Sequence, residues 1–301
     1  MRVRGFDAGN RSSWVLLALF LAVVWSLSGL IFRMVEEADA AQLIFYRGIA
    51  LSSFLVGLVA FRYRGGTIRA FRAIGGAGLT AGASLGIGSV FFLYAIMNTT
   101  IANVSFIIAS TPFLAAALAW VVMRERVGSR TLASCGLGLI GVTVMVWEGF
   151  AFGGWFGNLA ALGCAFLMAG YTVALRRGSQ VDMMPAVALS GYIAALTAVT
   201  LIDSFAISWH DFLLAALQGV IISALCNTAF AYCARHIPAA ELTLLSMLET
   251  VLSPFWVWLV IAETPEGATL IGGAVVLAAI GFEALWPLRQ RLLRRARSVG
   301  R

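Results

Sequence analysis

The chain has no lysine, only two histidines and little charge of either sign. Charged residues make up 12% of its 301 residues, whereas soluble domains carry about 25%. Hydrophobic residues reach 61%, and the mean hydropathy is +0.93. Apolar runs long enough to cross about 30 Å of hydrocarbon recur along nearly the whole length. These shortages exclude an ordinary soluble protein, and the sequence predicts an all-α integral membrane protein without a separate soluble domain.

Cysteine and histidine are too few and too scattered for a disulfide framework or a metal site. All four cysteines fall inside apolar runs and none forms a CxxC pair: Cys135, Cys164, Cys226 and Cys233. We interpret them as small packing residues. Neither His210 nor His236 lies in a cluster with metal-ligand spacing. The sequence therefore predicts no metal centre and no tightly bound cofactor.

Ten apolar segments are separated by charged residues, prolines or glycines, and each is a candidate membrane span. The predicted spans are residues 14–32, 43–61, 74–96, 101–122, 132–148, 156–175, 186–206, 212–234, 240–261 and 269–286. Only residues 97–100 separate the third span from the fourth. This spacing favours a tight helical hairpin over one very long helix.

Positive charge lies almost wholly on one side of this map. Arginine alone carries the net charge of +7, and every arginine except Arg33 and Arg47 falls at a terminus or in a connection on the same side. By the positive-inside rule that side is cytoplasmic, so we expect a bacterial inner-membrane protein with both termini in the cytoplasm. The arginines are spread over six segments rather than gathered in one patch. They therefore indicate orientation in the lipid bilayer and not a nucleic-acid partner.

A cleaved signal peptide is an alternative interpretation of the first span, because Ala38-Asp39-Ala40 has the small-x-small form of a cleavage site. The apolar stretch is longer than the roughly 7 to 15 residues of a signal-peptide core, and Glu36 and Glu37 intervene. A retained membrane span is favoured.

An internal repeat with a shift of 138 residues divides the chain. FLYAIMNTTIANVSFIIASTPFLAAALAWVVMRER (92–126) aligns with FAYCARHIPAAELTLLSMLETVLSPFWVWLVIAET (230–264). Each half holds five spans, an odd number, so the second half must cross the membrane in the opposite sense. Inverted repeats of this kind are typical of secondary transporters with a binding site near the midplane. The expected parts are a cytoplasmic segment 1–13, five-helix repeats 14–148 and 149–286, and a basic cytoplasmic tail 287–301.

Short motifs in a fixed order make the chain resemble a known family. They are WSLSG (25–29), FYR (45–47), LYA and TTIANVS (93–105), TP (111–112), RER (124–126) and LETVLSP (248–254). Together they resemble the EamA branch of the drug/metabolite transporter superfamily over nearly residues 14–286, and most of all the YddG-type aromatic amino-acid exporters. The resemblance implies two EamA repeats and an inner-membrane carrier that exports small metabolites, with aromatic and other neutral amino acids as the leading substrates.

Two of the ionisable residues within predicted spans are candidates for a part in transport, Glu249 and Arg47. Glu249 is about half way along the ninth span, where an unpaired carboxylate costs about 2.5–3.5 kcal/mol even on insertion scales. Two interpretations stay open: a group in a water-filled cavity that binds a substrate ammonium or a proton, and a structural acceptor. Arg47 can bind a carboxylate bidentately, but its place near the external end of the second span favours a structural or gating role.

Polar and aromatic residues on several spans would converge on the axis of an inverted repeat. The candidate substrate-binding residues are Trp25, Ser28, Tyr94, Asn103, Phe166, Tyr171, Asn227, Tyr232, Ser246 and Glu249. Aromatic walls with a few amides and hydroxyls suit a largely apolar ligand, although ordinary helix packing explains any single aromatic as well. Asn227 and Tyr94 are the strongest candidates, because buried amides and phenols need partners.

Residues at corresponding places in the two halves complete the candidate set. Glu125 and Glu263 are predicted gating or structural charges, like Arg47, and Pro112 and Pro254 are predicted hinges. Pro112 precedes Glu125 by thirteen residues whereas Pro254 precedes Glu263 by nine. The two helices are therefore expected to bend at different depths.

Other classes of protein fit the sequence less well. A membrane enzyme needs a nucleophile, a base and an orienting group at one depth, and the hydrolase-like GASLG (82–86) lacks both the strand–turn–helix context and a nearby histidine. We expect no enzymatic activity. A non-transporting receptor would not explain the inverted duplication. Export of another class of compound, such as a nucleoside, a purine or a cationic drug, stays open as an alternative. So do the transport direction, the coupling ion and the choice between monomer and homodimer.

Overall fold

The computed structural model describes residues 11–99, 101–147, 154–261 and 267–299. Within these ranges all regular secondary structure is helical, with no strand. Eight segments are long and apolar enough to cross a membrane, and shorter apolar helices cover Ser129–Met145 and Leu270–Leu285. Each predicted span overlaps one of these segments. The prediction of an all-helical, multi-pass membrane protein is therefore confirmed.

The first half of the chain consists of helices joined by short connections. They are α1 (Arg11–Arg33), α2 (Ala40–Tyr63), η1 (Arg64–Gly66), α3 (Thr67–Ala73), α4 (Gly75–Asn98), α5 (Ile101–Ile108), α6 (Thr111–Met123) and α7 (Ser129–Val146).

The second half repeats this pattern with a further irregularity in its third span. Its elements are α8 (Trp155–Arg177), α9 (Met184–Ala198), η3 (Val199–Leu201), α10 (Trp209–Leu217), the π-helical stretch η4 (Gln218–Leu225), α11 (Cys226–Cys233), α12 (Ala239–Ser246), α13 (Leu248–Ile261) and α14 (Gly267–Val299).

Local side chains explain where α2 and α10 begin. Asp39 and Gln42 form a reciprocal capping box, in which each side chain accepts a hydrogen bond from the backbone N–H of the other. Ser208 caps α10 by accepting from the N–H of Asp211. The buried Asp211 carboxylate in turn accepts from the N–H groups of residues 36–38. This acid therefore fastens the α1–α2 connection to the start of α10.

The fourth and ninth predicted spans are each interrupted. The first break lies at Ala109 and Ser110, between α5 and α6, and the second lies at Met247, between α12 and α13. The shift of 138 residues places Ala109 on Met247. At the first break, the hydroxyls of Ser110 and Thr111 donate to carbonyls one turn back, at 2.6 and 2.5 Å. Such local bonds compete with the helical ladder, so the break has a cause in the sequence.

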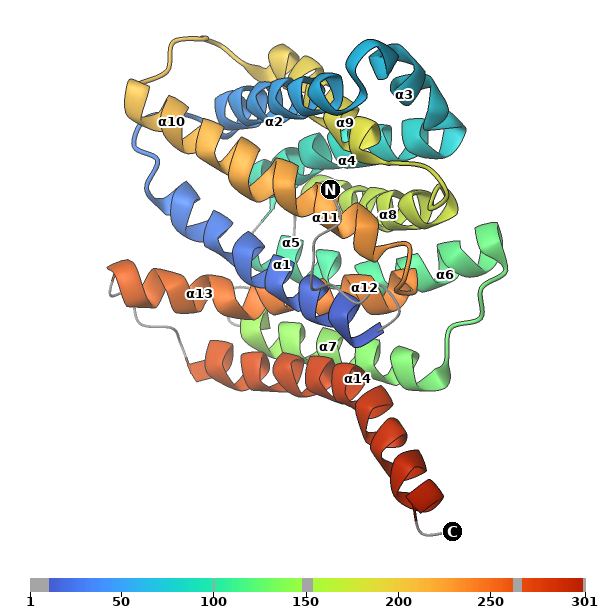
Figure 1. Ribbon diagram of the computed structural model, residues 1–301. Coiled ribbons are helices and arrows are strands. Elements are labelled where there is room, and N and C mark those ends of the chain that lie inside the picture. The colour runs from blue at the N-terminus through green and yellow to red at the C-terminus, as the bar shows by residue number, and fades with distance from the viewer. Residues whose placement is uncertain (1–10, 100, 148–153, 262–266, 300–301) are drawn as a thin grey trace.

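The helices form one bundle in which neighbours in space are distant in sequence (Figure 1). Helix α4 packs along α8 and α9, α14 runs beside α7, and α1 lies between α11 and α13. The connections that carry most of the described arginines, α2–α4, α6–α7, α8–α9 and α11–α12, lie at one end with the start of α1 (Figure 1). We call this the arginine-rich end.

Glycine lets two helix pairs approach backbone to backbone. A Cβ on Gly48 of α2 would lie 2.5 Å from the carbonyl oxygen of Gly191 of α9, and a Cβ on Gly191 would lie 2.4 Å from that of Gly48. Gly141 of α7 and Gly272 of α14 oppose each other in the same reciprocal way, at 2.8 and 2.3 Å. No side chain fits at these crossings.

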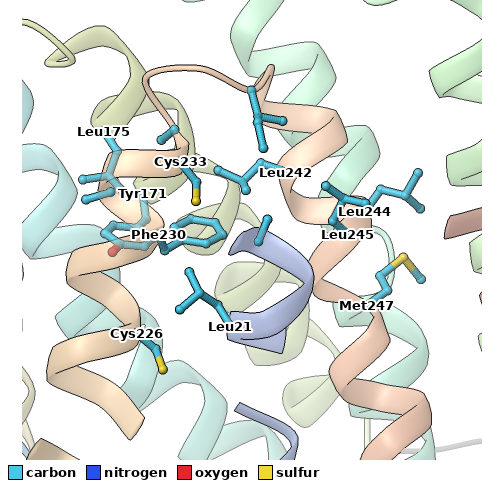
Figure 2. Close-up of a cluster of buried hydrophobic side chains, with 14 of the residues drawn as sticks. Leu21, Tyr171, Leu175, Cys226, Phe230, Cys233, Leu242, Leu244, Leu245 and Met247 are labelled. Carbon is cyan, nitrogen blue, oxygen red and sulfur yellow. The ribbon is translucent and has the colours of Figure 1, made fainter. Parts of the chain in front are cut away.

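The main buried cluster lies where α8, α11 and α12 meet α1. Leu242, Leu244 and Leu245 of α12 are fully buried, and Figure 2 shows them on the side of the cluster opposite Tyr171. Large exposed apolar side chains cover much of the outside, as expected of surfaces that face lipid rather than water.

Candidate functional site

An aromatic and amide cluster joins α1, α8 and α11. Tyr171 is buried on α8, and its hydroxyl donates to the side-chain oxygen of Asn227 at 3.3 Å. The Phe230 ring stacks on the Tyr171 ring, with centroids 6.0 Å apart and an interplanar angle of 10° (Figure 2). Trp25 of α1 also contacts Phe230, with ring centroids 5.3 Å apart. The structure thus brings together three residues that the sequence predicted, and it adds Phe230.

Glu249 lies in the first turn of α13, directly after the break at Met247. The side chain is half-buried, and within the described ranges no hydrogen bond or ion pair reaches its carboxylate. It lies within electrostatic reach of Cys226, the residue that precedes Asn227. The N-terminal end of a helix favours a negative charge by about 0.3–1 kcal/mol. The carboxylate therefore has a supportive helix end but no fixed counter-charge.

Other predicted binding residues lie elsewhere or serve local bonds. Ser246 donates to the carbonyl of Leu242 at 3.0 Å, and Ser28 is half-buried on α1. Tyr94 and Phe166 are 37% and 52% exposed. Their part in a binding site stays a prediction.

Asn103 belongs to a polar cluster at the start of α5. Its amide donates to the hydroxyl of Thr99 at 3.0 Å and to the side-chain oxygen of Asn158 at 3.2 Å. Thr99 also donates to Asn158, at 2.9 Å. These bonds join α4, α5 and α8 at the end of the bundle opposite the arginine-rich end.

Arg47 lies on α2 and faces α4 and the π-helical stretch of the eighth span. Its Nη2 is 3.4 Å from Ser89 Oγ. Together with Gln218, the first residue of η4, it lines a cavity of about 10 Å³, which is room for about one water molecule. Sequence reasoning missed Gln218, because hydropathy runs without change through η4. Single π-helical turns are frequent at functional sites.

Ion pairs gather at the arginine-rich end, and Glu125 is one of their members. Arg176 binds Glu125 through two contacts of 2.7 Å each. Tyr232, predicted as a binding residue, lies here as well, where its hydroxyl accepts from Arg62 at 3.2 Å and donates to Asp182 at 3.5 Å. Arg62 itself pairs with Asp182 at 3.3 Å.

Two buried acids at this end were not predicted. Glu283 of α14 is fully buried and pairs with Arg130 of α7 at 2.6 Å, and it also accepts from Thr131 and Ser134. Glu241 of α12 is 2% exposed and pairs with Arg11 of α1. Sequence reasoning missed both because they lie at the ends of predicted spans, where an acid is ordinarily hydrated.

The predicted hinges and the last predicted charge fall in three different settings. Pro112 is buried in the first turn of α6, three residues after the break begins at Ala109. Helix α13 is continuous through Pro254, and the break of that span lies at Met247 instead. Glu263 lies outside the described residues. Among the residues described, no group of three or more His, Cys, Asp or Glu side chains is placed to hold a metal ion.

Comparison with known proteins identifies the class. The EamA-like transporter family matches the chain twice, over residues 12–147 and 155–282. These matches cover most of the sequence, so the chain belongs to the EamA-like transporter family. It is a multi-pass membrane transporter of small molecules, as the motif order predicted.

A solved structure confirms the fold. A protein whose structure is titled "Crystal structure of protein" is similar over 92% of this chain and 99% of its own, with a TM-score of 0.79 and 19% sequence identity. At this identity the likeness concerns the fold alone. No curated protein sequence matches the chain.

Proposed function

We propose that this transporter is an inner-membrane carrier that exports aromatic and other neutral amino acids by alternating access around Glu249. The observation that carries the proposal is the carboxylate of Glu249 at a helix break, which has no partner among the described residues and lies within reach of the span that bears Asn227 and Phe230. An acid without a partner in a membrane span is a functional group by default. An ammonium group of the substrate would supply the missing counter-charge.

Two features support ten spans arranged as two inverted repeats. The breaks in the fourth and ninth spans fall at corresponding residues, Ala109 and Met247. Helices that would be symmetry mates also cross at glycines, α2 on α9 and α7 on α14. A two-fold axis in the membrane plane would produce such reciprocal crossings, and discontinuous helices that meet at the midplane are typical of this architecture.

The site offers separate places for the parts of an amino acid. Glu249 would bind the ammonium group, and the positive N-terminal ends of α6 and α13 would favour the carboxylate. The rings of Trp25 and Phe230 would contact an apolar side chain, with Tyr171 and Asn227 holding Phe230 in place. Aromatic walls with a few convergent polar groups suit a substrate of this kind.

The ion pairs at the arginine-rich end provide a gate. Arg11–Glu241, Arg62–Asp182, Glu125–Arg176 and Arg130–Glu283 each join a residue of the first half to a residue of the second. Movement of one half against the other would have to separate such pairs. The conformation described here is therefore proposed to be closed at the arginine-rich, cytoplasmic end.

An organic-cation exporter is a second candidate, and one observation favours it. The Glu249 carboxylate has no partner in the part of the chain that the structure describes, while Arg47 faces Ser89 and Gln218 rather than the aromatic cluster. A cation with an apolar body would satisfy Glu249 and contact aromatic rings without needing a partner for a carboxylate.

Flux in proteoliposomes tests both candidates. The purified protein is reconstituted, and labelled phenylalanine, tryptophan, threonine, a nucleoside and a quaternary ammonium cation are followed down their gradients. We expect saturable flux of phenylalanine and tryptophan that Glu249→Gln lowers at least about tenfold, equivalent to 1.4 kcal/mol of lost binding. Glu37→Gln, at an exposed acid in the α1–α2 connection, is the matched control and should leave flux unchanged.

The pattern of substrates separates the outcomes. Flux of the ammonium cation alone would replace the amino-acid proposal with the second candidate. Amino-acid flux that survives Glu249→Gln would return this residue to a structural role. Flux of no compound above that of empty liposomes would contradict both proposals.

A further inference from the structure

Glu241 differs from the other buried acid at the arginine-rich end in one respect. Both oxygens of Glu283 accept hydrogen bonds, from Arg130, Thr131 and Ser134. In Glu241, Oε2 pairs with Arg11, whereas Oε1 is buried and has no hydrogen-bond partner among the described residues. A buried carboxylate oxygen without a partner is costly. This geometry leaves one position at which a proton can bind.

The environment of Glu241 supplies little positive charge. The charged groups that act on Glu241 are Arg11 from α1, Arg130 from α7 and Glu283 from α14. The elements packed on α12 and the preceding turn also carry other described titratable groups: Glu125, Cys135, Cys164, Tyr171, Arg176, Arg177, Arg235, His236 and Glu249. Arg130 and Arg176 are already paired with Glu283 and Glu125. Arg11 is therefore the partner that holds Glu241 ionised.

Position links Glu241 to the proposed transport site. It precedes Glu249 by eight residues on the same interrupted span, which corresponds to about 12 Å along a helix. Glu241 lies on the side of Glu249 that faces the arginine-rich end. A proton that travels between Glu249 and that end would meet Glu241 on the way.

We infer that Glu241 is a proton-binding site and that its protonation releases Arg11, freeing the first turn of α1 from α12. The physical reason is that a neutral carboxyl no longer attracts the guanidinium, whereas the ionised carboxylate makes a charge-assisted hydrogen bond to it that is less screened than in water. The inference rests on the alternating access of the proposed function, and it names the group through which protons would control the cytoplasmic gate.

Cys233 is a natural reporter of this release. It is fully buried on α11, and its Sγ contacts the backbone oxygen of Trp14, one turn along α1 from Arg11. It belongs to the same buried cluster as Leu242, the residue that follows Glu241 (Figure 2). If the first turn of α1 leaves α12, the Cys233 thiol becomes accessible. Cys164, buried on α8, reports any general unfolding in the same sample.

The experiment measures alkylation of Cys233 by N-ethylmaleimide in lipid nanodiscs, without any substrate, by mass spectrometry of its peptide. The rate is divided by that of the same thiol in the unfolded chain at the same pH, because thiolate chemistry alone slows as pH falls. We expect this normalised rate to rise at least about tenfold between pH 8 and pH 5.5, as a single titrating group would allow. The rate at Cys164 should not rise.

Four variants test the assignment to Glu241. Glu241→Gln should label fast at both pH values, and Arg11→Gln should do so as well although it keeps the acid. Glu125→Gln breaks a neighbouring ion pair and should keep the rise, as should His236→Gln. The inference would be overturned by a labelling rate that does not change with pH in the natural chain, or by a rise that persists in Glu241→Gln. It would also be overturned by slow labelling of Arg11→Gln, or by loss of the rise in Glu125→Gln or His236→Gln.

The result is independent of the substrate question, because labelling needs no transported compound. Labelling that responds to pH as expected, in a protein that moves no amino acid, would support the proton site and remove the proposed substrate. Saturable amino-acid flux with labelling that does not change with pH would support the proposed substrate and overturn the proton site.

Discussion

Arg176 and Glu125 face each other side by side, with Nε 2.7 Å from Oε2 and Nη2 2.7 Å from Oε1. The remaining nitrogen, Nη1, donates to the backbone oxygens of Ile237 at 2.8 Å and Ala234 at 3.3 Å. One guanidinium therefore joins the end of α6, the end of α8 and the turn between α11 and α12. The planar fork of arginine is what permits all of these contacts at once.

Arg176→Lys should weaken this junction although it keeps the charge. A lysine ammonium cannot form the bidentate pair and reach the two carbonyls together. Both side chains of the pair are about a fifth exposed, so solvent screening limits the loss, and we expect about 1–2 kcal/mol. Thermal unfolding in detergent measures it, with Arg177→Lys at the exposed neighbouring position as control. Equal melting temperatures for the two variants would contradict the assignment.

The sequence predicted the helices well and the interruptions poorly, for a physical reason. A long apolar run predicts a membrane span because lipid imposes a length and an apolar surface, and each predicted span overlaps a helix. The breaks at Ala109 and Met247 and the π-helical η4 lie inside uniformly apolar sequence, so hydropathy carries no sign of them. The break at Ala109 has a local cause in the hydroxyls of Ser110 and Thr111, which hydropathy does not register.

The candidate site was predictable where it consists of polar residues in otherwise apolar sequence. Asn227 and Tyr94 were the strongest candidates because buried amides and phenols need partners. Asn227 accepts a hydrogen bond from the phenol of Tyr171 instead, whereas Tyr94 is 37% exposed. Phe230 carries no such sign, because one phenylalanine among many is ordinary core. Glu241 is visible in the sequence as an acid at the second residue of a predicted span. That its side chain is only 2% exposed depends on how α1 covers it, which the sequence does not show.

Gly272→Ala should destabilise the contact between α7 and α14. The added methyl group would lie 2.3 Å from the carbonyl oxygen of Gly141 and 2.6 Å from the backbone N of Met145, and backbone atoms cannot move aside as a flexible side chain can. Overpacking of this kind costs about 1–3 kcal/mol. The measurement is the melting temperature in detergent.

Gly281→Ala is the matched control on the same helix, because nothing lies within 4 Å of the position of its Cβ. It should be neutral or slightly stabilising, since alanine is the better helix former by up to about 1 kcal/mol. The predicted close crossing would be wrong if Gly272→Ala melted at the same temperature as Gly281→Ala.

Ser26→Ala should destabilise the packing of α1 on α13. The indole N–H of Trp256 donates to Ser26 Oγ at 2.7 Å, and Ser26 is fully buried. Removal of the acceptor leaves the indole N–H without its partner, which costs about 1–3 kcal/mol. Ser28→Ala, two residues along the same helix at a half-buried serine, controls for the loss of a hydroxyl.

A double-mutant cycle with Trp256→Phe isolates the hydrogen bond. Once the indole is gone, Ser26→Ala should cost distinctly less than in the natural chain, because no donor is left unpaired. Additive losses in the cycle would show that the bond contributes nothing beyond the two separate packing effects.

His236 should make the protein less stable in acid. Its ring stacks on Trp14 at 4.1 Å in the turn between α11 and α12, and the pKa of His236 is lowered, first by burial and then by the positive charge of Arg235. The folded chain thus binds a proton at this ring less readily than the unfolded chain does. Stability contributed by the neutral ring is present above the unfolded pKa of about 6.5 and is lost as pH falls through that value.

The prediction is read from the melting temperatures at pH 7.5 and pH 5.5 in detergent. His236→Gln cannot titrate, so the drop between the two pH values should be smaller than in the natural chain. His210→Gln, at an exposed ring that contacts the backbone oxygen of Met34 at the other end of the bundle, should leave the drop unchanged. If His236→Gln loses as much stability in acid as the natural chain, the acid sensitivity arises from another group.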